Sequence, residues 1–139
     1  MRRWRIPVGA ALVVALLAAC GPGSAARAAR DVAVAFSAAV AAGDGDAACA
    51  LLAESVAQSV AEDEEAPCAQ ALSEGPVADD LAERAADARP GEVRVAGRQA
   101  QVRLGSDTVF LARSGTGWVV TAAGCDPRPD RPYDCEVAA

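Results

Sequence analysis

The chain contains no histidine and no lysine, and all 13 of its basic residues are arginine. Histidine is the commonest general base and a common zinc ligand, and lysine is the Schiff-base nucleophile, so their absence removes three frequent routes to catalysis. Aromatic residues make up only 4% of the 139 residues, and alanine supplies much of the hydrophobic content. Small side chains pack with little dispersion energy, so we expect covalent cross-links to support the core.

The start of the chain has the layout of an export signal. Arg2, Arg3 and Arg5 form a positively charged beginning, and a twelve-residue apolar stretch from Val8 to Ala19 follows. A helix needs about twenty apolar residues to cross a bilayer. The stretch is therefore too short for a membrane span, and it predicts a cleaved leader.

The sequence Leu17-Ala18-Ala19-Cys20 at the end of this stretch resembles the lipobox of bacterial lipoproteins. The resemblance implies that residues 1–19 are a lipoprotein signal peptide and that Cys20 becomes the acylated first residue. Two acyl chains on one residue give the stable anchoring that a single chain cannot. The alternative is an ordinary secretory signal with a chance cysteine nearby. We expect a lipid-anchored protein on the outer side of the cell membrane, with the bilayer as its partner through Cys20.

The net charge of the mature chain is strongly negative. Without the three leader arginines, ten arginines face nineteen acidic residues, which gives 10 − 19 = −9. Nucleic acids and anionic headgroups would both be repelled. The small residues after Cys20 predict a short tether over 20–29, followed by one domain over 30–139.

Five cysteines become four once Cys20 is assigned to lipid, and an exported compartment allows these four to form two disulfides. Three pairings are possible. We favour Cys49 with Cys68 and Cys125 with Cys135, because each pair is close in sequence and lies within one half of the chain. A four-thiolate zinc site would need close Cys-x-x-Cys pairs, which the sequence lacks, so no metal is expected.

Hydrophobic spacing changes between the two halves of the chain. Apolar residues recur every three or four positions in the first half. They predict a helix over 28–42, a second capped by Asp44 or Asp46 that ends in the acidic run 62–65, a short third between Pro67 and Gly75, and a fourth from Pro76 towards Arg89. Period-two alternation then predicts four strands, 92–96, 99–104, 108–113 and 118–123. A type II′ turn at Gly97-Arg98 would place Arg94 opposite Gln101.

Helices followed by an antiparallel meander indicate the α+β class, with the helices packed on a curved four-stranded sheet. The chain resembles small exported lipoproteins of unknown function with a nuclear transport factor 2-like (cystatin-like) fold. The resemblance rests on 35–36, 42–44, 48–52, 67–68, 107–111, 117–118, 123–125 and 132–135. It implies a fold and a location, and it implies no activity.

Three sets of residues are candidates for function. Phe110, Trp118 and Tyr133 would line a small apolar pocket, with ordinary core packing as the alternative. Asp107 as base with Tyr133 as donor would suit an isomerase or hydrolase that uses carboxylates, although turn chemistry explains Asp107 better. The acidic groups at 44–46 and 62–65 would bind calcium, but capping and solvation explain them better. We expect a non-catalytic binding or interaction module for a small apolar ligand or a partner protein, with no cofactor.

Overall fold

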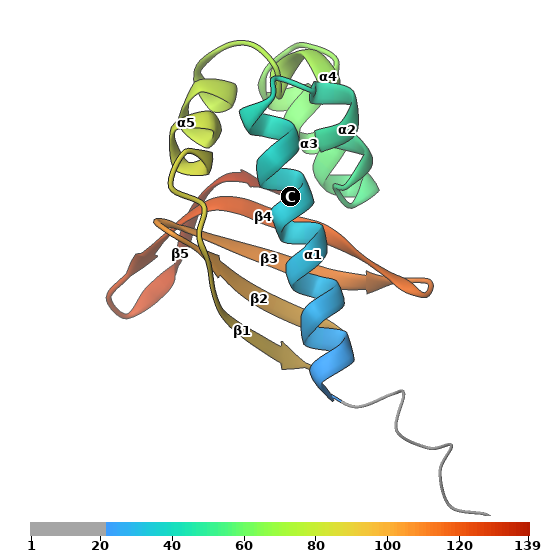
Figure 1. The fold of residues 1–139 in the computed structure, drawn as a ribbon. Coiled ribbons are helices and arrows are strands. Elements are labelled where there is room, and N and C mark those ends of the chain that lie inside the picture. The colour runs from blue at the N-terminus through green and yellow to red at the C-terminus, as the bar shows by residue number, and fades with distance from the viewer. Residues whose placement is uncertain (1–21) are drawn as a thin grey trace, which may run out of the picture.

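Within residues 22–139, which the computed structural model describes, helices come first and strands follow (Figure 1). The helices are α1 (Pro22–Ala41), α2 (Gly45–Ala50), α3 (Glu54–Asp63), α4 (Cys68–Ala71) and α5 (Pro76–Ala85). The strands are β1 (Pro90–Ala96), β2 (Gln99–Leu104), β3 (Asp107–Ser114), β4 (Gly117–Arg128) and β5 (Arg131–Ala138). The predicted α+β class is confirmed. The signal peptide and Cys20 lie outside the described residues.

The sheet is antiparallel with strand order β1-β2-β3-β4-β5, so the prediction of four strands was wrong by one. The missed strand is β5, which pairs with the second half of an unexpectedly long β4. Cys125 and Cys135 lie directly opposite one another, joined by a disulfide across Cα atoms 4.0 Å apart. This disulfide holds the β4–β5 hairpin together. The charged residues and prolines of the hairpin interrupt the alternation of apolar and polar residues by which a strand is predicted from sequence.

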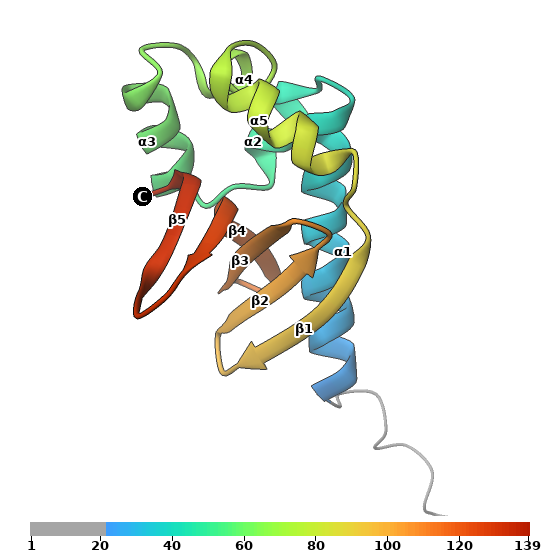
Figure 2. The same cartoon turned by 90° about the vertical axis from the view of Figure 1, so that its left-hand side faces the viewer.

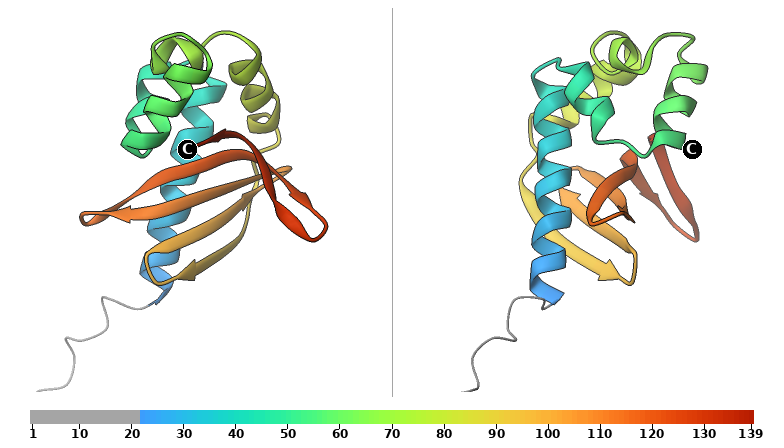
Figure 3. Two further views of the ribbon diagram at one scale, coloured as in Figure 1. Left: turned by 180° about the vertical axis from the view of Figure 1, so that it is seen from behind. Right: turned by 90° about the vertical axis from the view of Figure 1, so that its right-hand side faces the viewer.

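One face of the sheet is covered by α1, which lies across β1 to β4 (Figure 1). Ala100, Val102 and Leu104 alternate along β2 and are at most 4% exposed. They pack into one core cluster that also contains Phe36 of α1. Seen from behind, β1, β2 and β3 carry no helix on the opposite face (Figure 3, left). The helices therefore bury one face of these strands and leave the other open.

The first helix begins earlier than expected. Residues 22–29, assigned to a tether from the sequence, form the first turns of α1. Alanine has the highest helix propensity, and the alanines of this segment continue the buried stripe, since Ala29 is fully buried and Ala25 packs against the core. Within the described residues, 22–29 thus belong to the helix that packs on the core and form no extended tether.

The second predicted helix is broken into α2 and α3 by residues 51–53. Leu52 forms a parallel bridge to Val120, with hydrogen bonds from Ala53 N to Val120 O and from Val120 N to Leu51 O, both 2.8 Å. β5 pairs with β4 from Ala122 onwards, so this short segment supplies backbone partners for the earlier part of β4. The backbone N–H and C=O of Val120 need hydrogen-bond partners, and residues 51–53 provide them. The helix therefore breaks here, although the spacing of apolar residues in the sequence would continue it.

The short helices α2 and α4 are held against each other by the Cys49–Cys68 disulfide. Both predicted disulfide pairings are therefore confirmed. α2 and α4 approach so closely that a Cβ on Gly45 would overlap the carbonyl oxygen of Ala69. Viewed from the side, α2 to α5 gather at the end of α1 that is far from its N-terminus (Figure 2).

Candidate functional site

The open face of the sheet carries a small polar hollow, which we call the outer-face hollow. Its volume is about 60 Å³, and it is lined by Glu92, Arg94, Gln101, Arg103 and Tyr133. Ligand pockets for drug-sized molecules usually measure about 300–1,000 Å³. The outer-face hollow is therefore large enough for one small polar group and too small for a whole apolar ligand.

Strand register brings the two arginines of the hollow together. Arg94 on β1 lies opposite Gln101 on β2, as predicted, and the turn between the strands has Gly97 at φ 60°. Arg103 follows Gln101 by two positions, so its side chain projects from the same face. Diagonal neighbours of this kind lie about 7–8 Å apart, within reach of two long side chains. Both guanidinium groups can thus approach one ligand.

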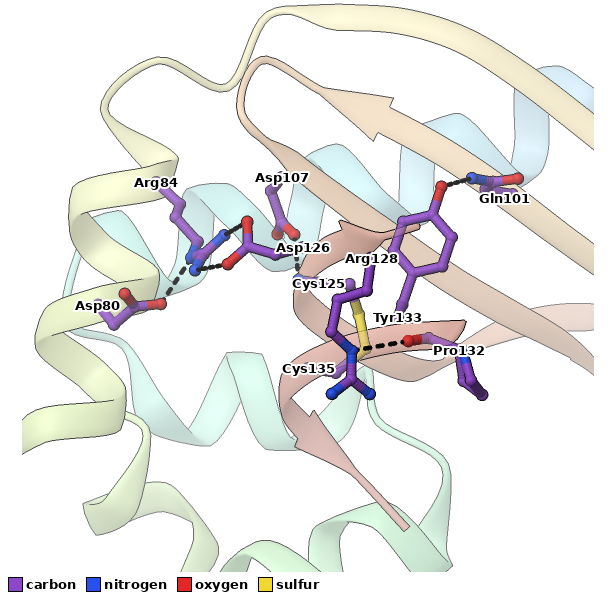
Figure 4. The surroundings of a disulfide bond; sticks show 10 residues. All are labelled: Asp80, Arg84, Gln101, Asp107, Cys125, Asp126, Arg128, Pro132, Tyr133 and Cys135. Atoms are coloured by element: carbon purple, nitrogen blue, oxygen red, sulfur yellow. Dashed lines mark hydrogen bonds and ion pairs between the residues drawn. A yellow bond between two sulfur atoms is a disulfide. The ribbon is translucent and has the colours of Figure 1, made fainter. Parts of the chain in front are cut away.

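Tyr133 reaches this site from the far edge strand. Its hydroxyl oxygen accepts a hydrogen bond of 3.1 Å from Nε2 of Gln101, across three intervening strand pairings of the sheet. Its ring packs edge-on against Phe110, with centroids 5.0 Å apart. Figure 4 shows the Tyr133 hydroxyl directed at Gln101, with the Cys125–Cys135 disulfide linking β5 to β4 two residues further along the strand. The disulfide-linked β4–β5 hairpin therefore places the phenol over the open face.

The electrostatic character of the hollow is positive within an acidic chain. Glu92 accepts a 2.9 Å hydrogen bond from Nε of Arg94 and raises the pKa of that guanidinium. The side chain of Arg103 has no ion-pair or hydrogen-bond partner in the part of the chain that the structure describes. Two arginines and one glutamate give a local charge of +1. The free donors are the guanidinium of Arg103, the remaining N–H groups of Arg94 and the Tyr133 O–H.

Only two of the three residues predicted to line an apolar pocket are brought together. Phe110 and Tyr133 contact each other on the open face. Trp118 lies opposite Arg113, which is three positions from Phe110, and therefore on the face that α1 covers. It is 5% exposed and belongs to the core. Successive side chains of β3 point to opposite faces of the sheet, so Phe110 and Trp118 lie on different faces. Trp118 is therefore a core residue, which was the alternative to the pocket.

Asp107 is the first residue of β3 and is 8% exposed. Its Oδ1 accepts a 2.9 Å hydrogen bond from the backbone N–H of Cys125 (Figure 4). The role is thus to satisfy a buried N–H of the neighbouring strand, which differs from the turn chemistry that the sequence indicated. Asp107 lines neither the outer-face hollow nor a second hollow of about 20 Å³ beside Glu136 and Val60.

The acidic residues considered for calcium have other positions. Asp44 caps α2 by accepting a 3.0 Å hydrogen bond from Ala47 N. The run 62–65 spans the end of α3 and the turn after it. Within residues 22–139, no group of three or more cysteine, aspartate or glutamate side chains is arranged so that it could hold a metal ion. No helix in that range is long and apolar enough to cross a membrane.

Sequence reasoning paired Arg94 with Gln101 but missed the site, because the site needs Tyr133 from a strand that was not predicted. The sequence around the last two cysteines does contain a signal for this missed strand. Cys125 and Cys135 flank the proline-rich and aspartate-rich segment 126–132, and Tyr133, Cys135 and Val137 alternate after it. Two paired cysteines around such a turn indicate a disulfide-linked hairpin.

Comparison of the chain with protein-family models, with curated proteins and with solved structures gives no match. Function must therefore be argued from the residues and their geometry.

Proposed function

We propose that this chain is an exported lipoprotein, anchored to the outer side of the cell membrane through acylated Cys20, whose domain is a non-catalytic binding module. The observation that carries the proposal is the Leu17-Ala18-Ala19-Cys20 sequence placed directly before a disulfide-bonded domain. Disulfides persist in oxidising compartments and are rare in the cytosol, so both bonds support export. No membrane-spanning helix is required by this arrangement.

The position of α1 supports an upright orientation on the membrane. Pro22 begins α1 two residues after Cys20, so the helix would rise almost directly from the lipid anchor. The segment 44–87, which holds α2 to α5, contains twelve acidic residues and only Arg84 as a base, a net charge of −11. Figure 1 shows these helices at the end of α1 opposite its N-terminus. Repulsion from anionic headgroups would keep this acidic end away from the bilayer.

The fold family we propose is the nuclear transport factor 2-like group. The support is the order of elements, with helices followed by an antiparallel meander whose one face is covered by α1. In this proposal the open face of the sheet is the binding surface, because it presents unpaired donor groups in the outer-face hollow. A polar ligand or a partner protein fits this surface better than the small apolar ligand expected from the sequence.

The alternative, an isomerase or hydrolase that uses carboxylates, gains little support from the site. Asp107, the candidate base, accepts a hydrogen bond from the Cys125 N–H and lines no hollow described above. A general base must lie within hydrogen-bond reach of a substrate proton. The geometry therefore favours binding over catalysis.

The anchor is tested by changing Cys20 to serine in the full-length gene. We expect Cys20→Ser to abolish labelling by a radioactive or clickable fatty acid and to release the protein from the membrane fraction. Cys49→Ser is the matched control, because it removes a cysteine of the folded domain and leaves the lipobox intact. A Cys20→Ser product that stays labelled and membrane-bound would overturn the proposal.

A further inference from the structure

We propose that the outer-face hollow binds a singly charged carboxylate, held between Arg103, Arg94 and the hydroxyl of Tyr133. The inference rests on the proposed binding role of the open sheet face and names the class of ligand that this face takes. It rests on charge, donor geometry and size.

The donors of the hollow are directed by contacts already made. Gln101 donates to the Tyr133 oxygen, so the hydrogen of that hydroxyl is available to another acceptor. Glu92 occupies Nε of Arg94, which leaves the terminal nitrogens of the guanidinium for a ligand. All the N–H donors of the Arg103 guanidinium are available to a ligand. A planar carboxylate matches the fork of N–H groups on a guanidinium, and such bonds are about twice as strong as neutral ones.

The charge of the residues that line the hollow favours a ligand with a single negative charge. The two arginines and Glu92 sum to +1, which one carboxylate neutralises. A phosphate dianion would leave a net negative charge beside the Glu92 carboxylate, within a domain that is itself acidic. A hollow of about 60 Å³ also suits a single carboxylate group. The Tyr133 ring, fixed by its edge contact with Phe110, forms an apolar wall for the first carbons of the ligand.

The carboxylate can belong to a free small acid or to the end of a peptide chain. Titrations of the full-length, ¹⁵N-labelled protein in detergent with sodium acetate and with N-acetyl-alanyl-alanine distinguish these sources. Ionic strength is held constant with sodium chloride, and the arginine Nε–H and Gln101 side-chain signals are followed by NMR. The amide of the same dipeptide tests the need for the charge.

We expect saturable shifts at Arg94, Arg103 and Gln101 with at least one carboxylate and none with the dipeptide amide. Saturation by acetate would assign a free small acid, and saturation by the dipeptide acid alone would assign a chain end. Arg103→Gln is expected to weaken binding at least fivefold, and Tyr133→Phe at least twofold. Arg98→Gln is the matched control, since Arg98 lies in the β1–β2 turn, where it donates to the Arg113 carbonyl, and affinity should be unchanged.

Glu92→Gln provides a readout that a structural role would not produce. It removes the negative charge beside Arg94 and raises the local charge from +1 to +2, so carboxylate affinity should increase severalfold and inorganic phosphate should begin to bind. Equal binding of the acid and its amide, or no saturable shift with either acid, would overturn the proposal. So would an unchanged affinity in Arg103→Gln. These outcomes leave the anchoring test at Cys20 unaffected, so the two proposals fail separately.

Discussion

The guanidinium of Arg84 on α5 holds the carboxylate of Asp126 on β4 by two parallel hydrogen bonds of 3.0 and 2.9 Å. The same guanidinium donates a 2.6 Å hydrogen bond from Nε to Asp80, one turn earlier on α5. The Arg84 side chain is 15% exposed, so these bonds join the last helix to the sheet at a partly buried position. Figure 4 shows the two carboxylates on either side of the guanidinium.

This pairing predicts how stability depends on pH. The hydrogen bonds from Arg84 lower the pKa of Asp126. A group whose pKa is lower in the folded state stabilises the fold above its unfolded pKa, which is about 3.9 for Asp, and that contribution is lost as the pH falls through the folded value. We expect Asp126→Asn to unfold at lower urea concentration than the wild type at pH 7, and the difference to shrink below about pH 4.

The matched control is Asp130→Asn. Asp130 lies in the β4–β5 turn at φ 56°, a conformation that asparagine adopts readily, and it has no ion pair within the described range 22–139. Its urea midpoint should follow that of the wild type at every pH. A gap between wild type and Asp126→Asn that persists unchanged at pH 2 would contradict the electrostatic explanation.

The buried carboxylate of Asp107 predicts a contrast between two substitutions. Asparagine keeps an oxygen that can accept the Cys125 N–H, and its neutral amide is easier to bury than a carboxylate. Alanine leaves the N–H without a partner, which costs about 1–3 kcal/mol. We expect Asp107→Asn to be at least as stable as the wild type at pH 7, and Asp107→Ala to be less stable by that amount.

Denaturant unfolding of both variants checks this contrast. Equal destabilisation by alanine and asparagine would show that the negative charge of Asp107, and not its acceptor oxygen, supports the fold.

Patterns in the sequence predicted the parts of the fold that local chemistry determines. Gly75 followed by Pro76 marks the start of α5, where Gly75 has φ 90° and Pro76 occupies the first turn. Likewise, Gly97 allows the tight turn that pairs Arg94 with Gln101. Each of these features depends on neighbours within a few residues, which a sequence displays directly.

Long-range contacts explain what the sequence did not reveal. The break at Leu52 exists because Val120 needs backbone partners, and these residues are 68 positions apart in a chain of 139. The outer-face hollow requires Tyr133 to meet Gln101, with a whole hairpin between them. The spacing of apolar residues indicates which face of a strand is buried. It does not indicate which distant strand places a side chain on the other face, as β5 does with Tyr133.

The close approach of α2 and α4 predicts that Gly45 tolerates no side chain. Alanine would place its Cβ on the Ala69 carbonyl, and the Cys49–Cys68 disulfide resists separation of the two helices. We expect Gly45→Ala to reduce the free energy of unfolding by about 1–3 kcal/mol. Gly23→Ala in α1 is the control, because nothing lies within 4 Å of its added Cβ, and it should cause no loss.

Combining Gly45→Ala with Cys49→Ser and Cys68→Ser tests the cause. Without the disulfide α4 can move aside, so Gly45→Ala should cost less in that background than in the wild type. Fully additive free energies would show that the disulfide does not enforce the close approach.

The indole of Trp118 predicts a further difference between substitutions. Its Nε1 is buried and has no hydrogen-bond partner in the described part of the protein, and the guanidinium of Arg113 lies 4.5 Å from its ring centroid. Phenylalanine removes the unpaired donor and keeps an aromatic face for Arg113, whereas alanine leaves a large cavity that costs about 3–5 kcal/mol. Trp118→Phe should therefore lose less than half the free energy that Trp118→Ala loses, measured by circular dichroism during denaturant unfolding. Equal losses would mean that the indole N–H makes a stabilising contact, because the cavity left by phenylalanine is much smaller than the one left by alanine.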